Sequence, residues 1–94
     1  MYARVSTING KSGNIDKVVK HFEEATAIET SKGWKGAYVL VDRQTGKILT
    51  ITLWESREDM EATVAEANQI RNQAIDIAGA VPATVEMYEV VLQP

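Results

Sequence analysis

The strongest candidate for a functional residue in this chain is Arg71, because it interrupts an apolar helical face. At 100° per residue it falls on the face formed by Met60, Val64, Ala67 and Ala74. A charge on such a face must be paired or must line a cavity. Two interpretations follow: a pocket guanidinium that binds a phenolate or carboxylate, or an arginine whose stem crosses the core edge to reach an acidic partner. The second arrangement is the commoner one in proteins.

Three further side chains qualify as ligand-binding groups of the same candidate pocket. Asn68 lies one turn before Arg71 on the flank of its face and can form a polar pair with it. Trp54 ends an expected strand, where a ring can wall a pocket for an aromatic ligand, and Tyr88 can donate a hydrogen bond into a cavity. Each has a structural alternative, respectively a solvated helix residue, a core anchor over the second helix and a half-buried strand tyrosine.

The remaining candidates are weaker. His21 is the only side chain that normally titrates near neutrality, but it lies off the apolar face of its helix, so we expect a boundary residue rather than a catalytic base. Arg4 and Ser6 share one face of the first strand, and the sequence leaves open which layer that face meets. An inward Arg4 would need a carboxylate such as Glu86 or Glu89.

Composition excludes several kinds of chemistry. The chain has 94 residues, no cysteine, one histidine and a net charge of -3. We therefore expect no cysteine-held zinc, no iron–sulfur cluster, no thiolate catalysis and, more broadly, no metal or other cofactor. The acidity argues against nucleic acid or an anionic membrane as a partner. Residues 1–10 lack the apolar core of a signal peptide, and no apolar run suits a membrane span, so we expect a cytoplasmic protein.

Hydrophobic patterning predicts a single domain over 1–94 with the order β-α-β-β-α-β. Asn14 and Ser56 are the expected N-caps of the two helices, and Gly33 and Gly79 are expected to end them. The expected strands cover 2–8, 34–41, 48–54 and 84–91, and the expected helices run from 15 to about 32 and from 57 to 78. Right-handed crossovers place both helices on one face of a four-stranded antiparallel sheet, with the first and third strands central. This is a ferredoxin-like α+β fold.

The strands predict a homodimer, because the sheet is apolar on both faces. Tyr38 and Leu40 point one way while Val39 and Val41 point the other, and the third and fourth strands show the same lack of polar alternation. The helices can cover only one face, and the other would expose an apolar patch larger than monomers usually carry. A second copy packed sheet to sheet is the simplest cover.

The stretch from Gly36 to Lys47, followed by Leu53-Trp54-Glu55-Ser56, resembles the antibiotic-biosynthesis-monooxygenase-like domains of the dimeric α+β barrel superfamily. The segments 3–8 and 86–90 fit the same pattern, so the resemblance covers essentially the whole chain. It implies a homodimer whose two sheets form a barrel, with a ligand cavity between sheet and helices in each protomer. Some members of the superfamily oxidise polycyclic phenols to quinones without metal or flavin. Others bind and degrade haem.

The chain departs from both enzymatic patterns. Many family members carry a histidine nine residues after the strand-end tryptophan, where this chain has Thr63. The haem-degrading branch uses an asparagine on the first strand with a tryptophan and a histidine on the second helix. Here the first strand has no asparagine before Asn9, and residues 57–78 contain neither tryptophan nor histidine. A haem iron would therefore lack its usual axial ligand.

Two functions stay open on the sequence. The first is a cofactor-independent monooxygenase acting on a small aromatic, phenolic metabolite. Such an enzyme needs only a dry pocket, a group that stabilises the phenolate and aromatic walls, and Arg71, Asn68 and Trp54 supply groups of those types. The second is a non-catalytic dimeric barrel that binds a small ligand or serves a stress-related role.

Overall fold

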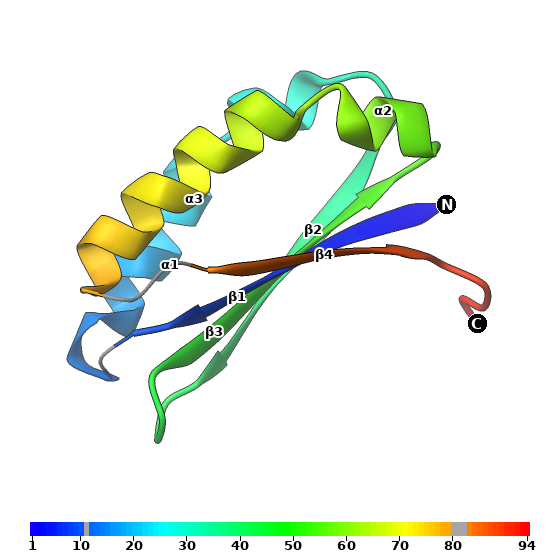
Figure 1. Cartoon of the computed structure of the whole chain (residues 1–94). Coiled ribbons are helices and arrows are strands. Elements are labelled where there is room, and N and C mark those ends of the chain that lie inside the picture. The colour runs from blue at the N-terminus through cyan, green and yellow to red at the C-terminus, as the bar shows by residue number, and fades with distance from the viewer. Residues whose placement is uncertain (11, 80–82) are drawn as a thin grey trace.

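The architecture is the expected ferredoxin-like α+β fold, with helices on one face of a four-stranded antiparallel sheet (Figure 1). The computed structural model describes residues 1–10, 12–79 and 83–94. With η marking a 3₁₀ helix, the elements in chain order are β1 (Tyr2–Asn9), η1 (Ser12–Asn14), α1 (Ile15–Glu24), η2 (Ala27–Thr30), β2 (Trp34–Asp42), β3 (Lys47–Trp54), α2 (Arg57–Glu61), α3 (Val64–Ala78) and β4 (Thr84–Glu89). The strand order is β2-β3-β1-β4, so the first and third strands are central as predicted.

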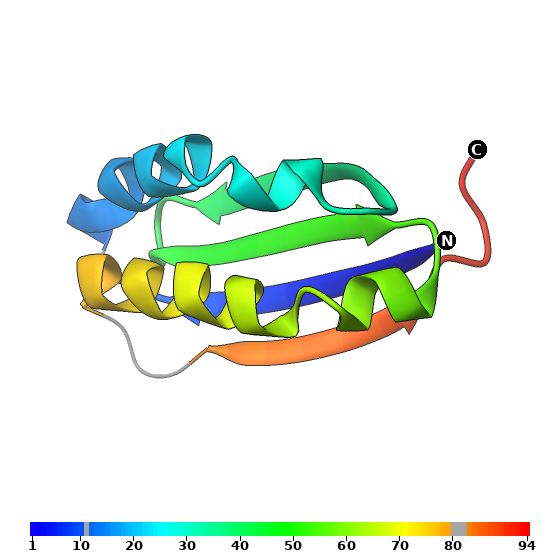
Figure 2. The same ribbon diagram turned by 90° about the horizontal axis from the view of Figure 1, so that it is seen from above.

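Seen from above, α1 and α3 run side by side over the sheet, and η2 and α2 continue these two rows toward the N-terminal end of β1 (Figure 2). None of the helices in the described ranges has the length and apolar character that crossing a bilayer requires.

The first helix ends earlier than predicted. α1 stops at Glu24 instead of continuing to about residue 32, and the following residues form η2. The turn lets Ile28, which is 8% exposed, pack with Trp54 and Met60 in a core cluster. Tertiary burial therefore overrides the helical propensity of this segment. Gly33, with a φ of 82°, lies after η2 and not at the end of α1.

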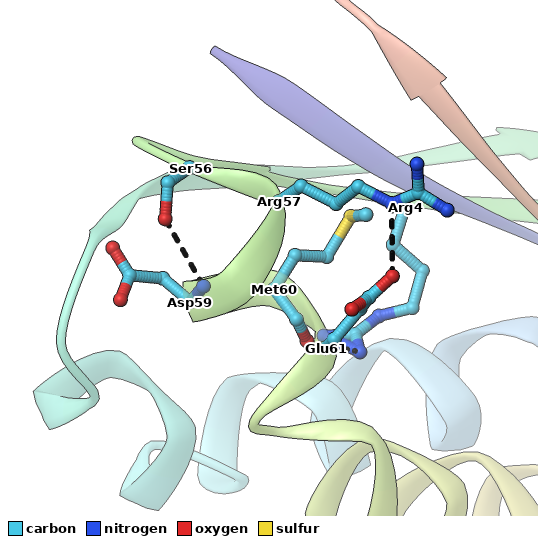
Figure 3. A network of polar contacts seen from close by, with 6 residues as sticks. All are labelled: Arg4, Ser56, Arg57, Asp59, Met60 and Glu61. Atoms are coloured by element: carbon cyan, nitrogen blue, oxygen red, sulfur yellow. Dashed lines mark hydrogen bonds and ion pairs between the residues drawn. The ribbon is translucent and has the colours of Figure 1, made fainter.

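The predicted N-caps have different outcomes. Ser56 accepts a hydrogen bond from the backbone N–H of Asp59 at 3.1 Å, which confirms the cap of α2 (Figure 3). Asn14 precedes α1 as expected, but its side chain makes no capping hydrogen bond. Its amide instead donates to the carbonyl oxygen of Ala78 at 3.3 Å, so it joins the start of α1 to the end of α3.

The second predicted helix is broken in two. α2 ends at Glu61 and α3 begins at Val64, because Thr63 leaves helical geometry with φ -105° and ψ 12°. Its hydroxyl donates to the carbonyl oxygen of Met60 at 2.9 Å and accepts from Nη2 of Arg4 at 2.8 Å. Nη1 of Arg4 also donates to the Met60 carbonyl at 3.3 Å. The strand arginine thus satisfies backbone and hydroxyl groups at the break. Figure 3 shows the side chain of Arg4 reaching Met60.

Two apolar clusters form the core, one toward each end of the central strands. Ile8 and Ile48 pair across β1 and β3 and belong to the first cluster. Trp54, at the other end of β3, belongs to the second. Between these ends the central strands direct small or polar side chains toward the helices, namely Ser6 opposite Thr50 and Arg4 opposite Thr52. The sheet side of the layer between sheet and helices is therefore small or polar at its centre.

The other face of the sheet is apolar and open in the single chain, as the strand patterns predicted. Tyr38 and Leu40 of β2 are 61% and 48% exposed, and Tyr88 of β4 is 50% exposed. Leu49, Ile51 and Leu53 of β3 alternate with the helix-facing residues and therefore lie on this outer face.

The helix break gives a test of the fold. Replacing Thr63 by valine keeps the side-chain volume but leaves Arg4 without its hydroxyl acceptor in a buried place, so we expect a loss of about 1–3 kcal/mol in the free energy of unfolding. Urea denaturation of the wild type and of T63V measures it. The matched control is T63S, which keeps the hydroxyl and should stay much closer to the wild type. Equal stability of T63V and wild type would contradict this account of the break.

Candidate functional site

A cavity of about 110 Å³ lies between the helices and the centre of the sheet. Arg4 and Ser6 of β1 and Thr50 and Thr52 of β3 line it from the sheet side. This is the place where the central strands carry small or polar groups between the two core clusters. The size is close to that of an apolar cavity of about 150 Å³ that accepts benzene in another protein. The cavity therefore suits a ligand built on one aromatic ring.

The walls of the cavity are largely apolar. Phe22 of α1, Trp34 of β2 and Ile70 of α3 face it from three different elements. The Trp34 ring also makes an edge-to-face contact with Trp54, with centroids 5.4 Å apart and planes at 85°. Such walls exclude water and stack on planar ligands.

Arg71 reaches this cavity from α3, as the helical face predicted. Its Nε donates to the hydroxyl of Ser6 at 3.2 Å, and its Nη1 donates to the side-chain carbonyl oxygen of Asn68 at 2.6 Å. Burial lowers the pKa of the guanidinium. Across the described residues, no carboxylate lies within ion-pair distance of Arg71. The second interpretation of Arg71 required an acidic partner at the core edge, and no such partner is present among these residues.

Arg4 is the second cation of the cavity and is only 3% exposed. Besides its bonds to Met60 and Thr63, its guanidinium lies over the Trp54 ring, 5.4 Å from the centroid. Burial lowers its pKa, and repulsion from Arg71 lowers it further. The expectation that an inward Arg4 needs Glu86 or Glu89 was wrong.

The reason lies in the geometry of β4. Glu86 pairs with Val5 across the sheet and therefore points away from the helices, where it accepts a hydrogen bond from Tyr88. A carbonyl, a hydroxyl and an aromatic face take the place of a carboxylate around Arg4.

The cavity therefore carries more positive than negative charge. Glu29 of η2 is the one acidic residue among the described residues that line it. Its side chain is exposed, and it forms no ion pair with Arg4 or Arg71. Two poorly neutralised guanidinium groups beside apolar walls attract an anion with an apolar body, such as a phenolate or an aromatic carboxylate.

The four predicted ligand-binding residues have different places. Arg71 lines the cavity, and Asn68 is exposed but holds Arg71 through its amide oxygen. Trp54 does not line the cavity. It is fully buried as a core anchor, and its indole N–H donates to the hydroxyl of Thr52 at 2.9 Å.

Tyr88 lies on the outer face of the sheet, away from the cavity. Its hydroxyl donates to Glu86 at 2.7 Å, and this hydrogen bond raises the pKa of Tyr88. Arg71 and its partner Asn68 are therefore found at the cavity, and Trp54 contacts it indirectly through Thr52. Tyr88 is not part of the site.

Several groups of the cavity were not singled out in the sequence as site residues, above all Thr52 and Trp34. Arg4 and Ser6 had been noted, but their direction was open. The sequence did contain a signal for this direction. Arg4 and Ser6 share one strand face with Ile8, and a strongly apolar isoleucine on that face indicates that the face points to the core. Thr52 and Trp34 carry no comparable signal.

His21 of α1 is half-buried where α1 packs against α3, and its Nε2 lies 3.0 Å from the carbonyl oxygen of Ile70. It does not line the cavity with the arginines, in agreement with the predicted boundary position. Among the residues that the structure describes, no cluster of histidine, aspartate or glutamate has the makings of a metal site.

Comparisons with curated proteins give relatives that are described as uncharacterised proteins. One protein of Mycobacterium tuberculosis is 34% identical over 92 residues, which covers 96% of this chain and 41% of the relative. A second protein of this bacterium is 33% identical over 95 residues, covering 98% of this chain and 39% of the relative. The chain thus spans about two fifths of the length of these relatives.

Among solved structures, the fold is similar to MhuD of Mycobacterium tuberculosis, a haem degrader with two haems bound in its active site. The TM-score is 0.73 at 27% identity, covering 100% of this chain and 99% of MhuD. It is also similar to SnoaB of Streptomyces nogalater, a cofactor-independent oxygenase, with a TM-score of 0.70 at 10% identity, covering 98% and 94% of the two chains. The second likeness shows the fold alone.

The family model of the antibiotic biosynthesis monooxygenases matches residues 1–69, which is most of the chain. The strand order, the helices on one face and the solved structures agree with that match. This chain belongs to the antibiotic biosynthesis monooxygenase family.

Proposed function

We propose that this chain is a cofactor-independent monooxygenase that acts on a small, single-ring phenol bound as the phenolate beside Arg71. The observation that carries the proposal is the pair of guanidinium groups, Arg4 and Arg71, that line an apolar cavity without a carboxylate partner among the described residues. A nearby cation lowers the pKa of a bound phenol and favours its ionised form. The family match supports the same interpretation.

The reaction needs only the phenolate and O₂. The electron-rich ring passes one electron to O₂, and the resulting radical pair joins to form a carbon–oxygen bond at a ring carbon. The peroxide takes up the proton that the phenol released on ionisation, and loss of water then cleaves the O–O bond and the ring C–H bond and leaves a carbonyl. One phenol and one O₂ thus give one quinone and one water. The substrate supplies all four electrons that reduce O₂. The chain's contribution is to hold the anion, to exclude water with Phe22, Trp34 and Ile70, and to stabilise negative charge.

A second function has one observation in its favour. The described residues that line the cavity include no histidine and no aspartate, and the single glutamate is exposed. A site without a buried base suits binding of a small anion without turnover. The alternative is therefore a non-catalytic barrel that binds a small aromatic anion, and the oxygen-uptake experiment below separates it from the enzyme.

Haem does not fit this cavity. Its described lining has no histidine, cysteine or methionine, and Tyr38 belongs to the outer sheet face by its register. These four residue types supply the usual axial ligands of haem iron. His21 contacts Ile70 outside the cavity. We therefore assign no role to haem in the proposed reaction.

The outer face of the sheet supports a homodimer. The exposed side chains of Tyr38, Leu40 and Tyr88 adjoin the apolar outer residues of β3, and the carboxylate on the outer face of β4, Glu86, is engaged by Tyr88. A second copy offers the same apolar face, so a two-fold axis matches apolar surface with apolar surface. We propose that residues 1–94 form one barrel-type domain that pairs in this way. A cytoplasmic location stays a prediction.

The enzyme proposal is tested with ¹⁸O₂ and model hydroquinones. We expect the wild type to accelerate oxygen uptake above the protein-free rate, to place one ¹⁸O in the quinone product and to release the other as water. R71M should lose at least about tenfold in rate, because removal of a charge-stabilising group typically costs more than that. Products that carry no label and are accompanied by hydrogen peroxide would show simple autoxidation. Uptake equal to the protein-free rate with every arene would leave the binding function in its place.

The absence of an ion-pair partner for Arg71 among the described residues predicts that its replacement weakens ligand binding without lowering stability. R71M replaces a partly buried cation by an apolar side chain, so the ligand-free protein should keep its free energy of unfolding within about 1 kcal/mol or gain stability. Benzoate should raise the Tm of the wild type and leave that of R71M unchanged. R71K, which keeps a positive charge, is the matched control and should retain part of the shift. Equal benzoate shifts in wild type and R71M would contradict the assignment of Arg71.

The dimer is tested by mass. Light scattering at micromolar concentration should give twice the monomer mass for the wild type. L40E, which places a charge on the exposed outer face of β2, should give the monomer mass with unchanged far-ultraviolet circular dichroism. T26E is a control with the same added charge at an exposed position between α1 and η2. A monomeric wild type would overturn the proposed interface.

A further inference from the structure

We propose that the hydroxyls of Ser6 and Thr52 form, with Arg71, a seat for two neighbouring oxygen atoms of the ligand. The substrate class is then an arene with two adjacent oxygens, as in a 1,2-dihydroxyarene or a carboxylate. This inference rests on the proposed function, because it concerns the same cavity and the same anion. To the proposed function it adds that the bound group carries two adjacent oxygens and that Ser6 and Thr52 select this group.

Thr52 lines the cavity and has a hydroxyl proton that, among the described residues, is free to be donated. Its Oγ1 accepts a hydrogen bond from the indole N–H of Trp54 at 2.9 Å, so one lone pair is occupied. A hydroxyl has one proton to donate and two lone pairs that accept. Within the described residues the Thr52 hydroxyl donates to no acceptor, and Thr52 lines the cavity. A ligand oxygen is the acceptor that the arrangement leaves room for.

Ser6 is arranged in the same way. Its Oγ accepts from Nε of Arg71 at 3.2 Å, and its own proton has no acceptor among the described residues. Ser6 is only 4% exposed, so bulk water has little access to it. A buried donor without an acceptor costs free energy that a bound oxygen recovers. The donation from a cation also polarises the hydroxyl and strengthens its own donation.

The register of β1 and β3 places these two hydroxyls at diagonal positions on the helix-facing side of the sheet. Ser6 lies directly opposite Thr50, so Thr52 is its diagonal neighbour across the strands. Diagonal cross-strand side chains start roughly 7 Å apart. Two O–H···O bonds of about 2.7 Å each meet on one oxygen only when the donors lie within about 5.4 Å of one another. Two adjacent ligand oxygens, each on its own hydroxyl, therefore suit donors at diagonal positions better than one shared oxygen does.

Arg71 completes the seat. Its Nε and Nη1 are held by Ser6 and Asn68, and its Nη2 makes no hydrogen bond with any described residue. The guanidinium is therefore fixed in orientation with one nitrogen free for the ligand. Three groups that surround the seat can each donate to it, namely Ser6, Thr52 and Arg71, so the site favours ligands that present acceptor lone pairs on both oxygens.

Thr50 provides a matched control on the same strand. It also lines the cavity, but its side chain makes no hydrogen bond among the described residues, so nothing orients its hydroxyl toward a ligand. T50V and T52V are the same chemical change two residues apart. They differ in whether the hydroxyl belongs to the proposed seat.

The test is calorimetric titration with benzoate, catechol and phenol as probes. We expect benzoate or catechol, or both, to bind the wild type at least about tenfold more tightly than phenol, and the stronger of the two identifies the source of the oxygen pair. T52V should reduce this advantage to threefold or less, on the order of the loss of one hydrogen bond. T50V should keep it, and T52S should restore it.

S6A is an independent variant that tests the other hydroxyl and is expected to lose the same advantage. Far-ultraviolet circular dichroism and a cooperative thermal unfolding transition confirm that each variant is folded. Phenol binding as tightly as both two-oxygen probes, or equal effects of T52V and T50V, would overturn the seat while leaving the proposed function intact. Binding of no probe, or binding independent of Arg71, would overturn the proposed function and this inference together.

Discussion

The structure depends on the burial of one arginine that has no carboxylate partner. Arg4 stands on a central strand, 3% exposed, between the two apolar clusters of the core. Its Nη1 and Nη2 donate to the Met60 carbonyl and the Thr63 hydroxyl, which become available because the helical segment breaks there. The break, the division of the core and the cavity beside Arg4 are thus consequences of one buried charge and the groups that solvate it.

The guanidinium of Arg71 adds a second positive charge near Arg4, and neither charge has a carboxylate partner among the described residues. Arg71 lowers the pKa of Arg4 in addition to the effect of burial, so each cation is held at a cost while the cavity lacks an anion. Replacement of such charges by apolar groups is often neutral or stabilising in proteins. A chain of 94 residues with a thin core gains little by keeping two of them for stability alone. Their retention in the cavity is understandable when an anionic ligand supplies the missing charge.

Much of the fold followed from local patterns, and much of the site did not. The four strands came from β-branched and apolar runs bounded by turn residues, and the second apolar face came from the lack of polar alternation within them. The strand order followed from the right-handed crossovers. The inward position of Arg71 came from helical periodicity. The early end of α1 and the break at Thr63 depend on Ile28 meeting Trp54 and on Arg4 meeting a residue 59 positions away, which no local pattern encodes. Tyr88 was misplaced as a candidate because a strand shows which residues share a face but not which layer that face meets.

The central claim is that the cavity is a seat for an anion, and a pair of isosteric ligands tests it most directly. Benzoate and benzamidine have nearly the same shape, but one carries two acceptor oxygens with negative charge and the other carries only donors with positive charge. Thermal unfolding of the wild type with each ligand at equal concentration and ionic strength measures the preference. The account predicts that benzoate raises the Tm and benzamidine does not. An equal rise with both ligands, or a larger rise with benzamidine, would contradict it.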